Sequence, residues 1–142
     1  MYLFMAAASI VAGALSTMNV WVDDIRHIRY SLNDVYMIAL MTGWMLFFMA
    51  LWEGDKMPMA VSAAIIVAAI AAIRGQWWVT PTQYIQGMIP HHSMAIHMSR
   101  KLTDRYPKAI PEIARTIISG QQREIEYMLE AQKRKDPSLS AA

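Results

Sequence analysis

Residues 80–99 read TPTQYIQGMIPHHSMAIHMS, and this stretch predicts a helix that carries a polar cluster. Thr80 and Gln83 match the capping box found at many helix starts, and Pro81 suits the first helical position. The helix is expected to run to about Asp104. At about 100° per residue, one face of it gathers Ile85, Met88, Ile89, His92, Ile96 and Ser99.

A second amphipathic helix is predicted to fold back on the first. Pro107 interrupts the first helix, and Pro111 suits the first turn of the next one, which continues to about Lys135. Residues 79–136 are therefore expected to form a two-helix hairpin, followed by a tail over residues 137–142. The apolar face of the second helix gathers Ile110, Ala114, Ile117, Ile118, Gln121, Ile125 and Met128.

Each of these two apolar faces has a polar side chain near its centre, His92 on the first helix and Gln121 on the second. Buried polar groups need hydrogen-bonding partners. One interpretation is a hydrogen bond between His92 and Gln121 that fixes how the two helices pair. On this alternative, the domain is a structural or interaction module in which the histidine pair and Gln121 form a buried polar layer.

The other interpretation is a metal site, because potential ligands are concentrated in one segment. Three of the four histidines and three of the thirteen methionines fall within residues 88–98. Imidazole nitrogen and thioether sulfur suit copper, and soft sulfur favours Cu(I). The chain has no cysteine, so a soft metal would depend on these residues. The predicted ligands are His91, His92, Met88, Met94 and Met98, completed by Glu124 and Met128 of the second helix and supported by Gln121 and His97.

Two local irregularities lie beside these candidate ligands. Pro90 leaves the carbonyl of Gln86 without its helical partner, and Gly120 costs about 1 kcal/mol relative to alanine inside a helix. We expect Gly120 to allow a close approach of the two helices. Local departures from good helix-forming sequence favour a functional site.

Three apolar stretches precede the hairpin, and each is long enough to cross a membrane. Residues 1–78 are therefore expected to form a membrane domain with spans at residues 2–22, 35–52 and 57–73. Polar connections separate the spans, and an odd number of spans puts the two ends of the chain on opposite faces of the membrane. Tryptophans mark the span ends, as in an aromatic belt, at positions Trp21, Trp52, Trp77 and Trp78.

The second span carries two further features. At its head, Asn33 and Asp34, with His27 nearby, form either a polar entrance or a helix cap. Methionines recur at every fourth position along it, and they indicate either a thioether path or ordinary apolar filling. These methionines are Met37, Met41, Met45 and Met49.

Several function classes are not supported. A net charge of +2 is too small to indicate nucleic-acid binding. No glutamate has a histidine three residues later, so the di-iron pattern of ferritin-type enzymes is not met. No serine or cysteine nucleophile constellation is visible. The protein is therefore not expected to be an enzyme.

Two segments resemble the domain of unknown function 305 family, DUF305. The first is YIQGMIPHHSMAIHMS at residues 84–99, and the second is IISGQQREIEYM at residues 117–128. The region from His27 to the methionine-rich span is also similar to that of membrane-anchored members. The family pattern is matched at His91, His92, Gln121, Glu124 and Met128.

The resemblance implies a ferritin-like helical bundle built of two-helix units, an extracytoplasmic location and, in some members, copper binding. Many membrane-anchored members have glycine, leucine and cysteine where this chain has Met94, His97 and Ser99, so its ligand set departs from theirs. One hairpin alone leaves much apolar surface exposed, which predicts either packing against the membrane spans or a homodimer, and a homodimer would complete a four-helix bundle.

The sequence thus predicts an all-α protein, in which three transmembrane helices precede a ferritin-like hairpin, in the cytoplasmic membrane. Its expected partners are the lipid bilayer, a metal ion and a second copy of itself. The charges flanking the spans favour a cytoplasmic hairpin by a margin of only two. The family resemblance implies the extracytoplasmic side, and we adopt that expectation.

Overall fold

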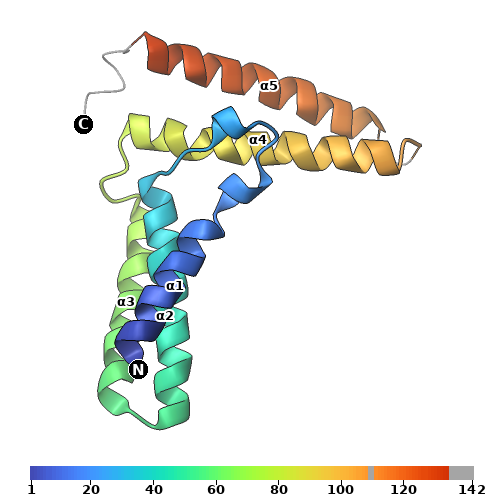
Figure 1. Cartoon of the computed structure of the whole chain (residues 1–142). Helices are drawn as coiled ribbons and strands as arrows, with labels where there is room; N and C mark the ends of the chain where they lie inside the picture. The colour runs from blue at the N-terminus through green and yellow to red at the C-terminus, as the bar shows by residue number, and fades with distance from the viewer. Residues whose placement is uncertain (109–110, 135–142) are drawn as a thin grey trace. The chain divides into compact units, whose positions relative to one another are not determined.

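The computed structural model describes residues 1–108 and 111–134, and within them the chain is helical and has no strand. The prediction of an all-α fold is confirmed. The helices divide into two compact units, one built from residues 1–17 and 32–79 and the other from residues 18–31 and 80–142. The elements, drawn in Figure 1, are α1 (Tyr2–Leu15), η1 (Met18–Trp21), η2 (Ile25–His27), α2 (Leu32–Glu53), α3 (Lys56–Gly75), α4 (Pro81–Arg105) and α5 (Pro111–Lys133).

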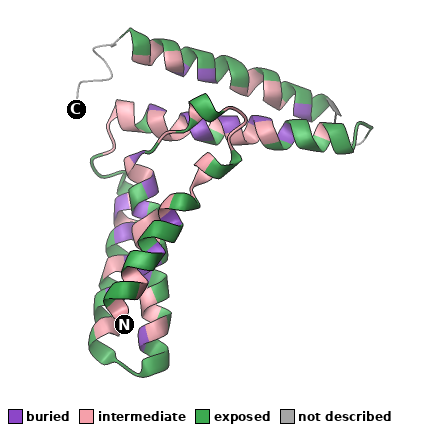
Figure 2. Cartoon of the chain, in the orientation of Figure 1, coloured by how far each residue is buried: buried purple, intermediate pink, exposed green. Residues whose placement is uncertain are grey.

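The first unit consists of α1, α2 and α3, with α2 packed against both of the others. Three segments are long and apolar enough to cross a membrane, as the sequence predicts, and they are Tyr2–Trp21, Leu32–Glu53 and Lys56–Gly75. Only 17–22% of each segment is buried, and Figure 2 shows exposed and intermediate positions along all three, which is compatible with helices surrounded by lipid. The α-helical part of the first segment ends at Leu15, and the 3₁₀ turn η1 completes it.

Close packing and side-chain hydrogen bonds hold α2 against α3. A Cβ atom added at Gly43 would stand 2.9 Å from Cγ1 of Ile66, so glycine allows the two backbones to approach. At the other end of the pair, the side-chain amides of Asn33 and Gln76 exchange two hydrogen bonds. Asn33 thus joins two span ends, a third role beside the cap and the polar entrance considered above.

The second unit is built on the predicted hairpin. Thr80 caps α4 by accepting a hydrogen bond from the backbone N–H of Gln83 at 3.3 Å, and Pro81 lies in the first turn. α4 and α5 then pack against each other around an apolar core of Ile85, Ile89, Ile96, Ile125 and Met128. The predicted core position Ile110 and the predicted tail at 137–142 lie outside the described residues.

One expectation needs correction. Gly120 does not mark a close approach of α4 and α5, because a Cβ atom placed there would meet nothing within 4 Å. The polar connection between the first two spans has a packing role that the sequence did not indicate. Residues 18–31 belong to the second unit, where η1 and η2 pack on α4. The reason is a set of polar contacts that this connection makes with α4.

Candidate functional site

The centre of the hairpin pairs His92 of α4 with Glu124 of α5. Nδ1 of His92 lies 2.9 Å from Oε2 of Glu124, and the histidine side chain is 13% exposed against 58% for the glutamate. The two atoms form an ion-pair contact, and no well-formed hydrogen bond satisfies the buried Nδ1 within the described residues. The helices therefore bring an imidazole nitrogen and a carboxylate into contact without satisfying the nitrogen.

Burial keeps the imidazole of His92 neutral. Removal from water disfavours the cation and lowers the pKa of His92 below its usual value, while the negative charge of Glu124 acts in the opposite direction. Neutral imidazole is the form that binds metal ions, because its free nitrogen carries a lone pair.

Gln121, one turn before Glu124, adds a second unsatisfied atom. Its Oε1 is buried and has no hydrogen-bond partner. The hydrogen bond between His92 and Gln121 expected on the structural alternative is not formed between these described residues. Two buried polar atoms without partners at one helix interface are costly, at about 1–3 kcal/mol each.

Three other predicted ligands lie in the same hairpin, and one of them contacts His92. The exposed ring of His91 lies edge-on to the ring of His92, with centroids 5.8 Å apart. Met128 is buried in the core of the hairpin, and Met88 packs against that core. The structure thus gathers thioether and imidazole side chains at the α4–α5 interface.

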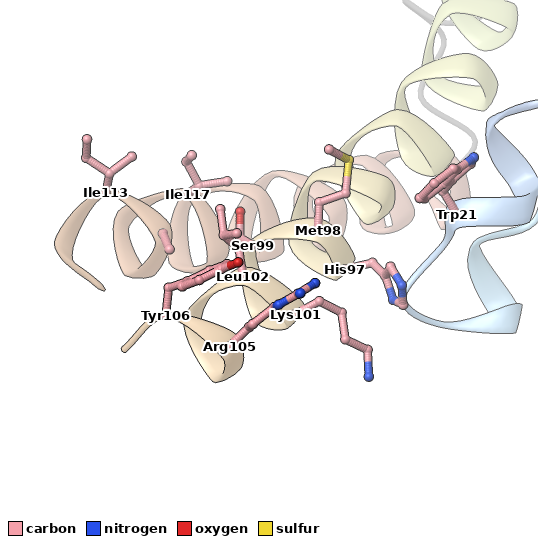
Figure 3. A pocket seen from close by; sticks show the side chains of 11 residues that line it. Trp21, His97, Met98, Ser99, Lys101, Leu102, Arg105, Tyr106, Ile113 and Ile117 are labelled. Carbon is pink, nitrogen blue, oxygen red and sulfur yellow. The ribbon is translucent and has the colours of Figure 1, made fainter. Parts of the chain in front are cut away.

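The remaining predicted residues lie elsewhere along α4. Met94 is half-buried on α4 and joins neither the core of the hairpin nor its grooves within the described residues. His97 and Met98 line a groove at the far end of the hairpin, which Figure 3 shows. Met98 follows His92 by six residues, which is about 9 Å along a helix axis. His97 and Met98 therefore belong to a different surface from the His92–Glu124 pair.

The chemistry of the donors restricts which ion could be held. Among the described residues, no three histidine, aspartate or glutamate side chains cluster closely enough to hold a metal ion. Any ion at this interface would need thioether sulfur to complete its ligands. That requirement fits a soft ion and does not fit magnesium or calcium, which take oxygen ligands.

A second polar cluster, which the sequence did not predict, anchors residues 18–31 to α4. Ser93 is fully buried, and its hydroxyl accepts a hydrogen bond from the backbone N–H of Asp23 at 2.9 Å. The same hydroxyl pairs with Nδ1 of His27, also at 2.9 Å. Next to it, the carboxylate of Asp23 accepts a hydrogen bond from Nη1 of Arg100 at 2.6 Å.

This Ser93 cluster is structural. Burial lowers the pKa of His27 and keeps its ring neutral, which suits a hydrogen bond with a hydroxyl. A serine with no exposed surface cannot reach a substrate, so the Ser93–His27 pair is not a nucleophile and base. The sequence offered two signals for this cluster: a serine directly after the histidine pair, and charged residues in the connection between the first two spans. Neither signal shows that the two segments contact each other.

Known proteins similar to this chain cover most of its length. The model of the family described as "Domain of unknown function (DUF305)" matches residues 49–132. The chain is also 43% identical over 134 residues to "Uncharacterized protein L153" of Acanthamoeba polyphaga mimivirus, covering 90% of this chain and 88% of that protein. No solved structure matches it significantly. The alignment with the viral protein is long enough to include parts of both units.

Proposed function

The chain belongs to the DUF305 family, and from this membership and the geometry of the α4–α5 interface we propose that it is a membrane-anchored protein that binds Cu(I). The observation that carries the proposal is the buried, unpartnered Nδ1 of His92, which lies 2.9 Å from a carboxylate oxygen of Glu124. Two ligand atoms that share one ion at about 2.1 Å in a tetrahedral site stand about 3.4 Å apart, so this pair would have to open by about half an ångström to hold a metal.

Thioether ligands make copper the favoured ion. His91 contacts His92, Met88 and Met128 belong to the core of the same hairpin, and sulfur donors select Cu(I) over harder ions. Gln121 would support the site by directing its buried oxygen toward a ligand N–H. Met94 and Met98 are additional donors along α4 for a delivered or departing ion.

The proposal includes a second copy of the chain. The two helices bury one small apolar cluster, in which five of the described residues are buried, and a homodimer would enclose it in a four-helix bundle of the ferritin-like type. With three spans in the cytoplasmic membrane, the hairpins would lie on its extracytoplasmic side. The role that fits these features is copper tolerance or transfer, without turnover of a substrate.

The test is an anaerobic Cu(I) titration of the detergent-purified full chain against a competing chelator. We expect the double variant His91→Ala/His92→Ala to lose affinity by more than the roughly 10- to 100-fold that the loss of a supporting partner costs. His97→Ala is the matched control, because it removes an imidazole from the same helix outside the interface, and it should bind like the wild type. Helix content by circular dichroism verifies folding.

A second pair of variants isolates the thioethers. Met88→Leu/Met128→Leu keeps apolar volume, and such exchanges usually cost less than about 1.5 kcal/mol of stability. Cu(I) affinity should fall while helix content and thermal stability stay close to wild type. Equal affinity in the wild type, the histidine variant and this variant would refute the copper site, and it would favour the structural module in which the histidine pair only specifies packing.

A further inference from the structure

A groove of about 450 Å³ lies where the end of α4 faces the start of α5 (Figure 3). Its walls are apolar, with Met98 and Leu102 from α4, Ile113 from α5 and Trp21 from η1. These side chains remain exposed: 54% for Trp21, 52% for Met98 and 64% for Ile113. Large apolar side chains that surround one hollow and stay exposed are typical of a binding site.

Cationic side chains border the same groove. Lys101 and Arg105 are four residues apart on α4, so they form a row beside the apolar row of Met98 and Leu102. No carboxylate is among the described residues that line the hollow. A ligand that matches this surface has an apolar body and a negatively charged head.

The chain itself connects the groove to the membrane. Trp21 is the last residue of the first candidate span, Tyr2–Trp21, and it also lines the groove. The end of a span lies at the level of the lipid headgroups, where tryptophan is enriched. If this segment crosses the bilayer, Trp21 brings one wall of the groove to the level of the headgroups.

We propose that this groove binds a phospholipid with an anionic headgroup. An acyl chain packs against Trp21, Met98 and Ile113, and the phosphate is held by Lys101 and Arg105, whose long side chains reach outward from an apolar stem. The inference uses the membrane anchoring proposed above and is independent of the metal. Lipid at this position would orient the hairpin relative to the bilayer.

The absence of native cysteine allows a site-specific test. The full chain with Ile113→Cys is labelled with a nitroxide and reconstituted in nanodiscs of phosphatidylcholine alone or of equal parts phosphatidylcholine and phosphatidylglycerol. Collision of the label with a water-soluble nickel chelate and with oxygen is then measured by electron paramagnetic resonance. Phosphatidylglycerol should lower collisions with nickel and raise those with oxygen at position 113. A label at Tyr127→Cys, on α5 outside the groove, should not respond.

Charge variants test whether the groove causes the response of the label to phosphatidylglycerol. Each surface cation contributes about fivefold to the attraction of anionic lipid. Lys101→Gln/Arg105→Gln should therefore remove most of the response in the equal mixture, because two cations together contribute about 25-fold. Lys108→Gln/Lys133→Gln removes the same charge from exposed positions outside the groove and should leave the response unchanged.

Three results would overturn the inference. One is an equal response in both lipid mixtures, and another is an equal loss in the two charge variants. The third is dipolar broadening between labels at position 113 of two copies in both lipids, which would mean that a second copy fills the groove. Failure of the chain to enter nanodiscs would instead count against the membrane anchoring, so the two proposals fail separately.

Discussion

Ser93 shows how a single hydroxyl can organise a distant segment. It has no exposed surface, and its oxygen meets both the backbone N–H of Asp23 and the ring of His27. Without this oxygen, a partly buried donor and a partly buried ring nitrogen would lose their partner, and each such group costs up to about 1–3 kcal/mol. The Asp23–Arg100 ion pair lies partly in solvent and contributes less, since exposed pairs are typically worth under about 1 kcal/mol.

Ser93→Ala is therefore expected to loosen residues 18–31 from α4. A loss of about 1.4 kcal/mol corresponds to a tenfold faster amide exchange, so the Asp23 amide should exchange at least about ten times faster. Hydrogen exchange followed by mass spectrometry on the detergent-solubilised full chain measures this. Ser119→Ala is the control, because Ser119 bonds only to its own helix at Thr116. Unchanged exchange over residues 18–31 would show that the apolar contacts of η1 suffice.

At the scale of the element, α5 carries a glycine that the monomer does not require. Gly120 lies in the middle of the helix, yet the space beyond its Cα is open to at least 4 Å. Gly87 in α4 is different, because a Cβ atom there would stand 3.0 Å from Oγ of Ser31. Both positions have the same helix-propensity cost, and only one of them has a packing reason.

Gly120→Ala should stabilise α5 by about 1 kcal/mol, because alanine loses less backbone entropy on folding and meets no neighbour. Gly87→Ala gains the same propensity but presses on Ser31, so its stabilisation should be smaller or negative. Thermal loss of helicity, measured by circular dichroism for both variants, ranks the two. If Gly120→Ala instead lowers stability together with the dimer fraction, the glycine serves contact with a second copy.

At the scale of the whole molecule, three spans would place all segments of the second unit on the same face of the membrane. If Tyr2–Trp21, Leu32–Glu53 and Lys56–Gly75 each cross the bilayer, residues 22–31 and the chain after Gly75 emerge on one face. These are the parts that fold together in the second unit. An even number of crossings between them is what allows η1 and η2 to pack on α4.

Topology can be tested with the single variants Ile28→Cys, Glu53→Cys and Lys108→Cys, using a membrane-impermeant maleimide on intact cells. We expect positions 28 and 108 to label together and position 53 to label only after permeabilisation. If only position 53 is labelled in intact cells, the protein has three spans in the opposite orientation. Different behaviour of positions 28 and 108 would contradict the three-span arrangement.

The sequence by itself determined the helices and the core of the hairpin. Apolar runs of about 20 residues can satisfy their backbone in lipid only as helices, so the spans were readable from composition. The periodicity of Ile85, Ile89, Ile96 and Ile125 likewise assigned the buried face, and Thr80 with Pro81 marked the start of α4. These features are local, because each depends on neighbours within a few turns.

Only the tertiary structure decided which polar groups meet. His92 faces Glu124 rather than Gln121, and His27 reaches Ser93 across 66 positions of sequence. Such pairings depend on how two helices rotate and slide against each other, and a shift of one residue turns a side chain by about 100°. Periodicity fixes which face of a helix is buried, but the partner of a given atom follows from the packing of both helices.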